Sequence, residues 1–240
     1  MKEIKVKKKK KLYEGKAKIV YETENEELLI QEFKDDATAF DGKKKGKIKE
    51  KGAFNNQISG RLFTFLESYH VPTHFVSQFS ANAMVIKRLE MIPVEVVMRN
   101  VATGSLVKRY GVKDGTELDH PIIEFYLKDD AKHDPMINED HVIAFGHADA
   151  DEIKLIKRYA QKINAVLQSF FFRRGMVLVD FKLEFGRGKS GKIKLGDEIS
   201  PDTCRLWDAQ SGEKLDKDRF RQDLGKVEEA YREVHRRVFS

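Results

Sequence analysis

Cysteine is almost missing from this chain of 240 residues, since Cys204 is the only one. One cysteine excludes an internal disulfide and is typical of a reducing compartment, so we expect a cytoplasmic protein. No apolar run approaches the roughly 20 residues that a membrane helix needs. The lysine-rich start has no apolar stretch of the kind that a signal peptide carries. We therefore expect neither a membrane segment nor a secreted, disulfide-stabilised domain.

A strong excess of one charge is also missing. Acidic residues nearly balance basic ones, 39 against 45, so the formal net charge is only +6. The excess lies mainly in two lysine-rich segments, residues 2–11 and 42–52. Lysine runs are usually solvated, and anionic small substrates explain basicity as well as nucleic acid does. Because no recognisable RNA- or DNA-binding motif accompanies the lysines, we expect no nucleic-acid partner.

The stretch 176–202 carries the clearest pattern in the chain. Apolar residues fill alternate positions from Val177 to Phe185, which predicts a strand whose successive side chains point to opposite faces. The second face carries an acid, a base and an acid, which are Asp180, Lys182 and Glu184. Residues 192–199 alternate again after an irregular turn, so the whole stretch is predicted to be a β-hairpin.

The charged face of this hairpin has two interpretations. Carboxylates beside a lysine suit a divalent metal that also binds phosphate oxygens, because hard cations prefer oxygen ligands. Alternatively, the strand simply has one solvated face. Asp197 on the second strand could join Glu184 in a sparse magnesium site, although strict alternation turns Asp197 to the apolar side. A bulge at Gly196 would redirect it toward the charged face.

Two glycine-containing segments invite a phosphate-binding interpretation. Residues 186–191 match G-x-G-x-x-G and resemble the end of a P-loop, but both motifs require a following helix and a strand is predicted here. We therefore interpret these glycines as turn residues. Residues 15–18, Gly-Lys-Ala-Lys, lie between two predicted strands and are comparable to the glycine-rich phosphate lid of protein kinases. An ordinary hairpin with lysines at its tip is the alternative.

The remaining sequence predicts the scaffold. Apolar periodicity predicts helices over residues 53–70, 104–111, 149–174 and 216–239, and strands over 28–33, 73–92 and 94–98. Pro93 lies near a candidate domain joint, which divides the chain into a sheet domain over residues 1–90 and a second domain over 91–240. A nucleotide base is predicted to lie between them, against the connection from Lys87 to Met91.

One further pair of residues forms a candidate phosphate site. Arg99 ends a predicted strand, and Ser105 lies in the first turn of a predicted helix. A guanidinium group supplies a fork of donors and the start of a helix supplies free backbone amides, so the two together suit a phosphate. The alternative is that Ser105 only caps its helix.

Several blocks of the sequence resemble the SAICAR synthetase family of purine biosynthesis. The two most specific blocks are residues 179–186, VDFKLEFG, and residues 195–207, LGDEISPDTCRLW. Further similar blocks lie at residues 13–18, 97–100, 104–109, 132–136 and 217–222. Together they span nearly the whole chain in order. The visible departure is the lysine-rich segment 43–51, which looks longer than usual for the family.

The resemblance implies a fold and a reaction. The fold would be α+β, with a kinase-like antiparallel N-terminal sheet and an ATP-grasp-like C-terminal domain. The reaction would be the ATP-dependent condensation of L-aspartate with the carboxylate of carboxyaminoimidazole ribotide (CAIR), giving SAICAR, ADP and phosphate through an acyl phosphate. The resemblance also implies Mg²⁺, ATP as co-substrate and a homodimer.

The resemblance also assigns roles to single residues. The residues that would bind ATP are Gly15, Lys16 and Lys18 at the phosphates, with Lys87 and Met91 near adenine. The residues that would bind Mg²⁺ are Glu184 and Asp197. The residues that would bind CAIR are Arg99, Ser105, Asp180, Lys182 and Arg205, of which Asp180 and Lys182 would be catalytic. No general base for the aspartate amine is evident, and residues 35–52 are a candidate lid over the aspartate site.

Two other functions remain open from the sequence. A kinase-like small-molecule phosphotransferase fits the glycine lid and the metal carboxylates as well, although no His-Arg-Asp or Asp-Phe-Gly set of a protein kinase is present. A basic nucleic-acid-binding module is the third possibility, and it depends only on the lysine clusters.

Overall fold

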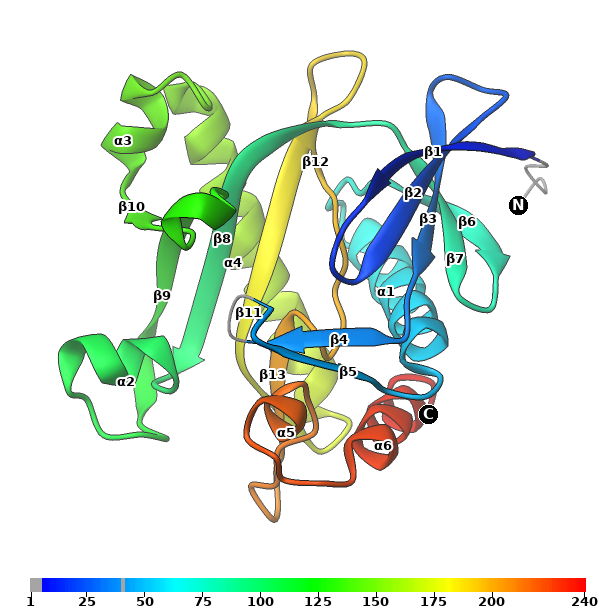
Figure 1. Cartoon of the computed structure of the whole chain (residues 1–240). Coiled ribbons are helices and arrows are strands. Elements are labelled where there is room, and N and C mark those ends of the chain that lie inside the picture. The colour runs from blue at the N-terminus through cyan, green and yellow to red at the C-terminus, as the bar shows by residue number, and fades with distance from the viewer. Residues whose placement is uncertain (1–5, 40–41) are drawn as a thin grey trace.

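The computed structural model describes residues 6–39 and 42–240 and contains two large antiparallel sheets and one small one (Figure 1). The N-terminal sheet has the strand order β1 (Lys8–Glu14), β2 (Lys18–Thr23), β3 (Leu28–Phe33), β7 (Ala83–Lys87) and β6 (Phe75–Ser80). The C-terminal sheet has the order β10 (Met136–Ile137), β9 (Glu117–Leu127), β8 (Glu90–Val101), β11 (Met176–Arg187) and β12 (Ile193–Leu195), with β13 (Cys204–Asp208) also paired to β11. The third sheet is the hairpin of β4 (Asp36–Ala39) and β5 (Lys44–Lys47).

Helices cover the large sheets and complete the α+β fold. The longer ones are α1 (Lys51–Ser68), which packs on the N-terminal sheet, and α4 (Ala150–Phe172), which packs on β8 and β11. The short ones are α2 (Ser105–Tyr110), the 3₁₀ turn η1 (Asp130–Lys132), α3 (Glu139–Ala144), α5 (Asp218–Arg221) and α6 (Val227–Val238). None of the helices in the described ranges is long and apolar enough to cross a membrane. The predicted α+β class is confirmed.

The two large sheets share one apolar core. Buried side chains from α1, β3 and β7 belong to the same cluster as those from β8, α4 and β11. The sheets separate in sequence between Lys87, the last residue of β7, and Glu90, the first of β8, while Pro93 itself lies inside β8. We therefore propose residue 90 as a boundary between two sheet units that fold around a common core; residues 1–5 of the first unit lie outside the described part of the chain.

Helix α4 illustrates how local sequence sets the element boundaries. The Asp149 side chain accepts a hydrogen bond from the Glu152 amide, and the Glu152 side chain accepts one from the Asp149 amide, which satisfies two free donors at the helix start. Gly175, just past the end, has φ +66°, a conformation that glycine adopts without steric cost. The helix predicted over 149–174 is therefore confirmed.

Two sequence predictions need correction. The predicted continuous helix over 216–239 is divided into α5 and α6, because Asp223, Gly225 and Lys226 adopt positive φ angles between them. The lysine-rich segment is not a simple loop in its described residues, since it forms the β4–β5 hairpin. Gly46 of this hairpin lies directly against the Phe220 ring, where an added Cβ would come within 2.9 Å of a ring carbon. The lysine-rich hairpin is thus packed on the segment that contains α5.

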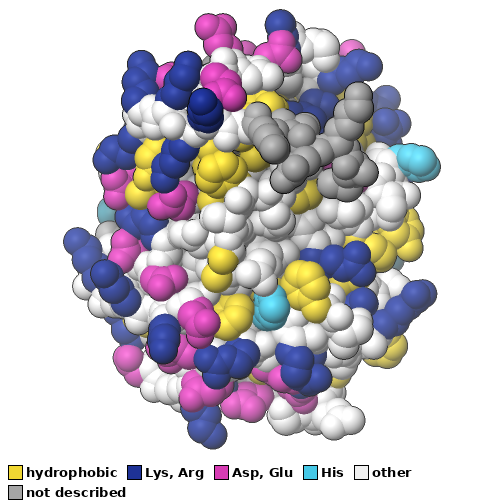
Figure 2. All heavy atoms as spheres, turned by 90° about the vertical axis from the view of Figure 1, so that its right-hand side faces the viewer, with side chains coloured by type: hydrophobic (Ala, Val, Ile, Leu, Met, Phe, Trp, Pro, Cys, Tyr) yellow, Lys and Arg dark blue, Asp and Glu magenta, His cyan; other side chains and the backbone are white. Residues whose placement is uncertain are grey.

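Charges of both signs intermix on the molecular surface. Figure 2 shows lysine and arginine side chains interspersed with acidic ones over the face that it presents, without a continuous basic area. Nucleic-acid binding through phosphate contacts depends on a concentrated basic footprint. This face therefore gives no support to the nucleic-acid interpretation.

Candidate active site

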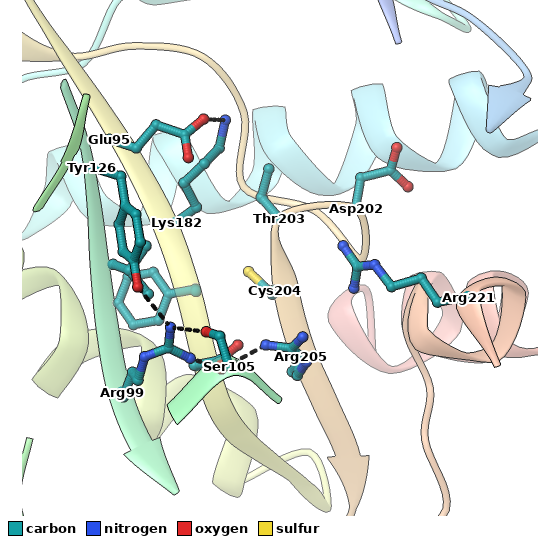
Figure 3. Close-up of a pocket in the computed structure, with 13 residues that line it drawn as sticks. Glu95, Arg99, Ser105, Tyr126, Lys182, Asp202, Thr203, Cys204, Arg205 and Arg221 are labelled. Carbon is teal, nitrogen blue, oxygen red and sulfur yellow. Dashed lines mark hydrogen bonds and ion pairs between the residues drawn. The ribbon is translucent and has the colours of Figure 1, made fainter. Parts of the chain in front are cut away.

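Two adjoining cavities collect most of the residues that the sequence singled out. The smaller cavity, of about 240 Å³, contains Arg99, Ser105, Asp180 and Arg205 in its wall (Figure 3). The larger, of about 1090 Å³, is lined by the β1–β2 turn with Gly15, Lys16 and Lys18, and by Glu184 and Asp197. Four residues line both cavities and mark their junction: Glu95, Lys182, Asp202 and Thr203.

A single carboxylate holds the two arginines of the smaller cavity. Asp180 Oδ2 accepts hydrogen bonds from Arg99 Nη1 at 3.0 Å and Arg205 Nη1 at 2.8 Å. A second carboxylate lies behind each guanidinium, since Arg99 Nε donates to Glu124 at 2.7 Å and Arg205 Nε to Asp218 at 2.8 Å. Burial disfavours charge on both arginines, but these carboxylates outweigh it and raise the pKa of each. Both guanidinium groups are thus charged and fixed in orientation.

Ser105 belongs to this arrangement rather than to the helix cap. The residue before helix α2 is Gly104, with φ +58°, and it makes no side-chain cap. The Ser105 hydroxyl instead accepts a hydrogen bond from Arg99 Nη2 at 2.9 Å. An added Cβ on Gly104 would lie 3.0 Å from Arg205 Nη2, so a side chain at this position would press on the guanidinium. The interpretation of Ser105 as only a cap is wrong.

Lysine and carboxylate side chains form ion pairs with each other in the wall of the larger cavity. The Lys18 ammonium pairs with Asp197 and, at 3.0 Å, with Glu198. Lys182 Nζ lies 3.2 Å from both Glu95 Oε1 and Asp197 Oδ2 and is also bonded to Glu184. Burial opposes the charge of each lysine, but the carboxylates outweigh it and raise the pKa of both Lys18 and Lys182. These ammonium groups stay charged at neutral pH.

The charged face of β11 is buried, which decides between its two interpretations. Asp180 and Glu184 are each only 4% exposed. Both carboxylates are paired with cations: Arg99 and Arg205 donate to Asp180, and Lys128 and Lys182 donate to Glu184. A buried carboxylate requires compensation by cations or hydrogen bonds. The solvated-face interpretation is therefore wrong for this strand.

Asp197 reaches the charged face by a backbone reversal. Gly196 continues the β11–β12 ladder, since its amide donates to the Glu184 carbonyl at 2.9 Å. Asp197 itself adopts φ +56°, so the redirection occurs at this residue and not through the bulge predicted at Gly196. The Gln31 side chain donates to the Asp197 carbonyl at 3.2 Å, and buried His74 also bonds to the Asp197 backbone. These contacts hold an aspartate in a conformation that costs free energy.

Glu184 and Asp197 form the carboxylate pair that could hold a metal. Both face the larger cavity, and Lys182 connects them. Within residues 6–39 and 42–240, no cluster of three or more His, Cys, Asp or Glu side chains forms a full protein cage for a metal. Two hard oxygen donors at an open cavity fit Mg²⁺, which usually keeps waters and takes further ligands from substrate phosphates.

The tip of the β1–β2 hairpin spans from one sheet unit to the other. The Gly15 amide donates to the Lys18 carbonyl at 2.9 Å, and Lys16 Nζ lies 2.9 Å from Asp130 in η1. The Tyr13 ring covers the turn, where an added Cβ on Gly15 would come within 3.0 Å of its hydroxyl. The turn therefore sits over the larger cavity, as a phosphate lid would.

The two residues predicted to lie near adenine are outside both cavities. Lys87 Nζ donates to the Thr73 carbonyl at 3.2 Å. The Met91 side chain packs on Gly186 and Gly196, where an added Cβ would meet Met91 atoms at 3.0 to 3.1 Å. Both residues thus lie at the connection between β7 and β8, where the N-terminal sheet meets the β11–β12 hairpin.

Sequence reasoning missed several charged residues of the site. The missed residues are Glu95 and Lys128 beside Glu184, Glu124 and Asp218 behind the arginines, and Asp202, Lys217 and Arg221 in the cavity walls. Burial raises the pKa of Glu95, and Glu184 adds to the effect while Lys182 opposes it. Glu95 lies opposite Glu184 in the β8–β11 register, and local sequence spacing does not report this pairing.

Two adjoining polar cavities on an α+β scaffold are typical of an enzyme that holds two ligands next to each other. Comparison with known proteins then gives the family. The family model described as SAICAR synthetase matches residues 11–238. Phosphoribosylaminoimidazole-succinocarboxamide synthase of Chlorobaculum tepidum is 60% identical over 227 residues, covering 95% of this chain and 96% of that protein.

Solved structures agree with the family model. The same synthase from Ehrlichia chaffeensis is 47% identical, with a TM-score of 0.94 and coverage of 95% of this chain and 98% of that one. A SAICAR synthetase in complex with ADP is 50% identical, with a TM-score of 0.92 and coverage of 94% and 96%. The chain belongs to the SAICAR synthetase family and is an ATP-dependent ligase of purine biosynthesis. The predicted family and enzyme class are confirmed.

Proposed function

We propose that this chain condenses CAIR with L-aspartate through an acyl phosphate, releasing ADP and phosphate. The observation that carries the proposal is the position of Lys182 at the junction of two cavities, one arginine-lined and one lined by the β1–β2 turn. A ribotide in the smaller cavity and a nucleotide in the larger one would meet beside this lysine. Phosphoryl transfer depends on such positioning and on charge neutralisation.

The smaller cavity suits CAIR. Arg99, Ser105 and Arg205 would bind its phosphate and ribose side, because two oriented guanidinium groups match phosphate geometry. Asp180, which orients both arginines, would also meet the imidazole amine. Lys182 would contact the carboxylate that is to be activated. Asp180 and Lys182 are accordingly the proposed catalytic residues.

The larger cavity suits ATP. Gly15, Lys16 and Lys18 would hold its phosphates, since a glycine turn presents backbone amides while the lysines supply charge. Lys87 and Met91 would border adenine at the joint between the sheet units, outside the cavity walls. Glu184 and Asp197 would hold Mg²⁺. When bound, Mg²⁺ neutralises charge that develops on the transferring phosphoryl group.

The chemistry follows from the poor reactivity of a carboxylate. An amine does not expel oxide from it, so a carboxylate oxygen of CAIR first attacks the γ-phosphorus of ATP and ADP leaves. The amine of L-aspartate then attacks the acyl carbon, phosphate leaves, and the nitrogen loses a proton. Lys182 stabilises the negative charge beside the reacting carboxylate throughout. No residue is assigned as the acceptor of the amine proton.

We also propose a homodimer and a cytoplasmic location. Buried Cys204 is the free thiol of the chain, and burial raises its pKa, which keeps it protonated and unreactive. An unreactive thiol and the absence of a second cysteine suit a reducing compartment. Sedimentation of the purified protein over a range of concentrations tests the dimer.

One coupled assay tests the proposed reaction. Purified protein with Mg-ATP is expected to release ADP steadily only when CAIR and L-aspartate are both present, with SAICAR as the product. Steady phosphorylation of CAIR without L-aspartate would favour the kinase-like phosphotransferase. Salt-sensitive nucleic-acid binding without any turnover would support the third interpretation instead.

A further inference from the structure

Lys217 is a cation in the wall of the larger cavity whose ion pair with a described residue is a long one. Its side chain is 13% exposed, and its Nζ lies 3.7 Å from Asp202 Oδ2. That carboxylate is already bonded to Lys51 Nζ at 2.8 Å and to the Tyr231 hydroxyl at 2.6 Å. The Asp202 charge is therefore largely satisfied without Lys217, which is left with only a distant ion pair.

Other lysines of this cavity are committed to carboxylates. Those within hydrogen-bonding distance of an acidic side chain are Lys16, Lys18, Lys34, Lys128 and Lys182. Lys45 also lines the cavity, but it is solvent-exposed on β5. Burial lowers the pKa of Lys217; Asp202 and Glu198 oppose this effect, while Arg221 and Lys51 add to it. An anionic ligand at Lys217 would offset the cost of burying its ammonium group.

The position of Lys217 separates it from the two phosphate sites. It directly precedes α5, whereas the β1–β2 turn contributes a different wall of the cavity; Figure 1 shows the β4–β5 hairpin between these two elements. Lys217 lines only the larger cavity, so it does not face the ribotide site of Arg99 and Arg205. Its neighbour Asp202, however, lines both cavities and marks their junction.

We propose that Lys217 binds a carboxylate of L-aspartate and so places the amine of that substrate at the junction beside Lys182. This inference depends on the proposed function, which supplies three anionic substrates. Two of them have phosphate groups with sites of their own, and the dicarboxylate is the one that remains. A lysine ammonium at a partly buried wall forms a charge-assisted hydrogen bond with such a group.

The test compares steady-state kinetics of the wild type with those of Lys217→Met. We expect the KM for L-aspartate to rise about 10- to 100-fold, the size expected for loss of a hydrogen bond to a charged group. The KM values for CAIR and ATP should stay within about twofold of the wild type. Lys217→Arg keeps the charge and should recover most of the aspartate affinity. Lys214→Met is the matched control, because Lys214 bonds to Gln222 outside both cavities and should leave all three KM values unchanged.

The outcomes separate this inference from the proposed function. Wild-type protein that forms no SAICAR would overturn both. Wild-type turnover with an unchanged aspartate KM in Lys217→Met, or with equal increases for all three substrates, would overturn the inference alone. Thermal unfolding checks that the variants are folded. If Lys217→Met does not fold, Lys217→Gln removes the charge with less loss of polarity and carries the same expectation.

Discussion

The two cavities neutralise their charges in different ways. In the smaller one, Asp180 in the wall bridges Arg99 and Arg205. Glu124 and Asp218 lie behind these arginines, outside the wall, and fix the guanidinium groups for a ligand in front. In the larger one, Glu184, Asp197 and Glu198 face the same space as the lysines with which they pair. The first arrangement is preorganised, whereas under the proposed function the second would exchange its lysine contacts for metal and phosphate contacts when ligands bind.

The largest expected effect comes from the carboxylate that both arginines share. Asp180→Asn removes a buried charge that compensates two guanidinium groups, and breaking such a pair typically costs roughly 3–5 kcal/mol. We expect kcat/KM for CAIR to fall by about 10³-fold, with a smaller change in the KM for ATP. Steady-state kinetics with each substrate varied in turn measures this. An equal rise in KM for CAIR and for ATP would mean that the smaller cavity is not a preorganised ribotide site.

The next prediction distinguishes the larger cavity, whose lysine contacts would be replaced by ligand contacts, from the preorganised smaller cavity. Glu184→Gln should lower activity by about 10²-fold at ordinary Mg²⁺ and recover part of it at high Mg²⁺, because the loss is one of metal affinity. Arg205→Ala is the comparison: it should raise the KM for CAIR more than that for ATP and gain nothing from added Mg²⁺. Titration with Mn²⁺ followed by its spin resonance reports metal binding directly. Unchanged kinetics in Glu184→Gln would remove this residue from the site.

A smaller effect is expected at Gln31, which contacts Asp197 of the proposed metal-binding carboxylate pair. Gln31 is 4% exposed and donates to the carbonyl of Asp197. Gln31→Leu removes that donor from a backbone in the left-handed region, so we expect about a fivefold weaker apparent affinity for Mg²⁺, equivalent to about 1 kcal/mol. Gln57 of α1 bonds to His235 and has no hydrogen bond to Asp197, so Gln57→Leu serves as the control. Equal Mg²⁺ affinities in Gln31→Leu and the wild type would show that Asp197 holds its conformation unaided.

The last prediction concerns the dependence of stability on pH rather than activity. Burial lowers the pKa of His74 to about 3, against about 6.5 in an unfolded chain. Between these values the unfolded state binds more protons than the folded state, so this histidine makes the free energy of unfolding fall as pH falls from about 6.5 toward 3. The contribution is at most about 1.4 kcal/mol per pH unit. Urea unfolding from pH 7 to pH 4 should show a flatter profile for His74→Gln, and parallel profiles would contradict a neutral buried His74.

The alternation of apolar and charged side chains along β11 could be predicted from the sequence, but the burial of its charged face could not. Alternation fixes which side chains share a face. Whether that face meets water depends on β8, β9 and β13, which bring Arg99, Glu124 and Arg205 from distant parts of the chain. Local spacing carries no information about such pairing. Arg99 could be predicted as a phosphate ligand from its place at a strand end before Ser105, whereas only the family resemblance pointed to Arg205.

Two local backbone conformations also could not be predicted from the sequence. The helical periodicity of residues 216–239 continues across the break between α5 and α6, because apolar spacing does not report backbone reversals. Asp197 takes φ +56° without being glycine, and tertiary contacts with Gln31, Lys18 and Lys182 help to hold it there. Strained backbone of this kind is overdetermined by the surrounding structure and is common at functional sites.

The hydrogen bond from Tyr231 to Asp202 has a consequence for synthesis of the chain on the ribosome. Asp202 lies at the junction of the cavities, and its carboxylate is bonded both to Lys51 of α1 and to Tyr231 of α6. A nascent chain that has not yet exposed Tyr231 leaves one acceptor of a buried carboxylate unsatisfied, which is costly. Both sheets can therefore emerge and begin to pack while the junction is still incomplete. Catalytic competence should appear as a late, abrupt step of translation rather than accumulate with chain length.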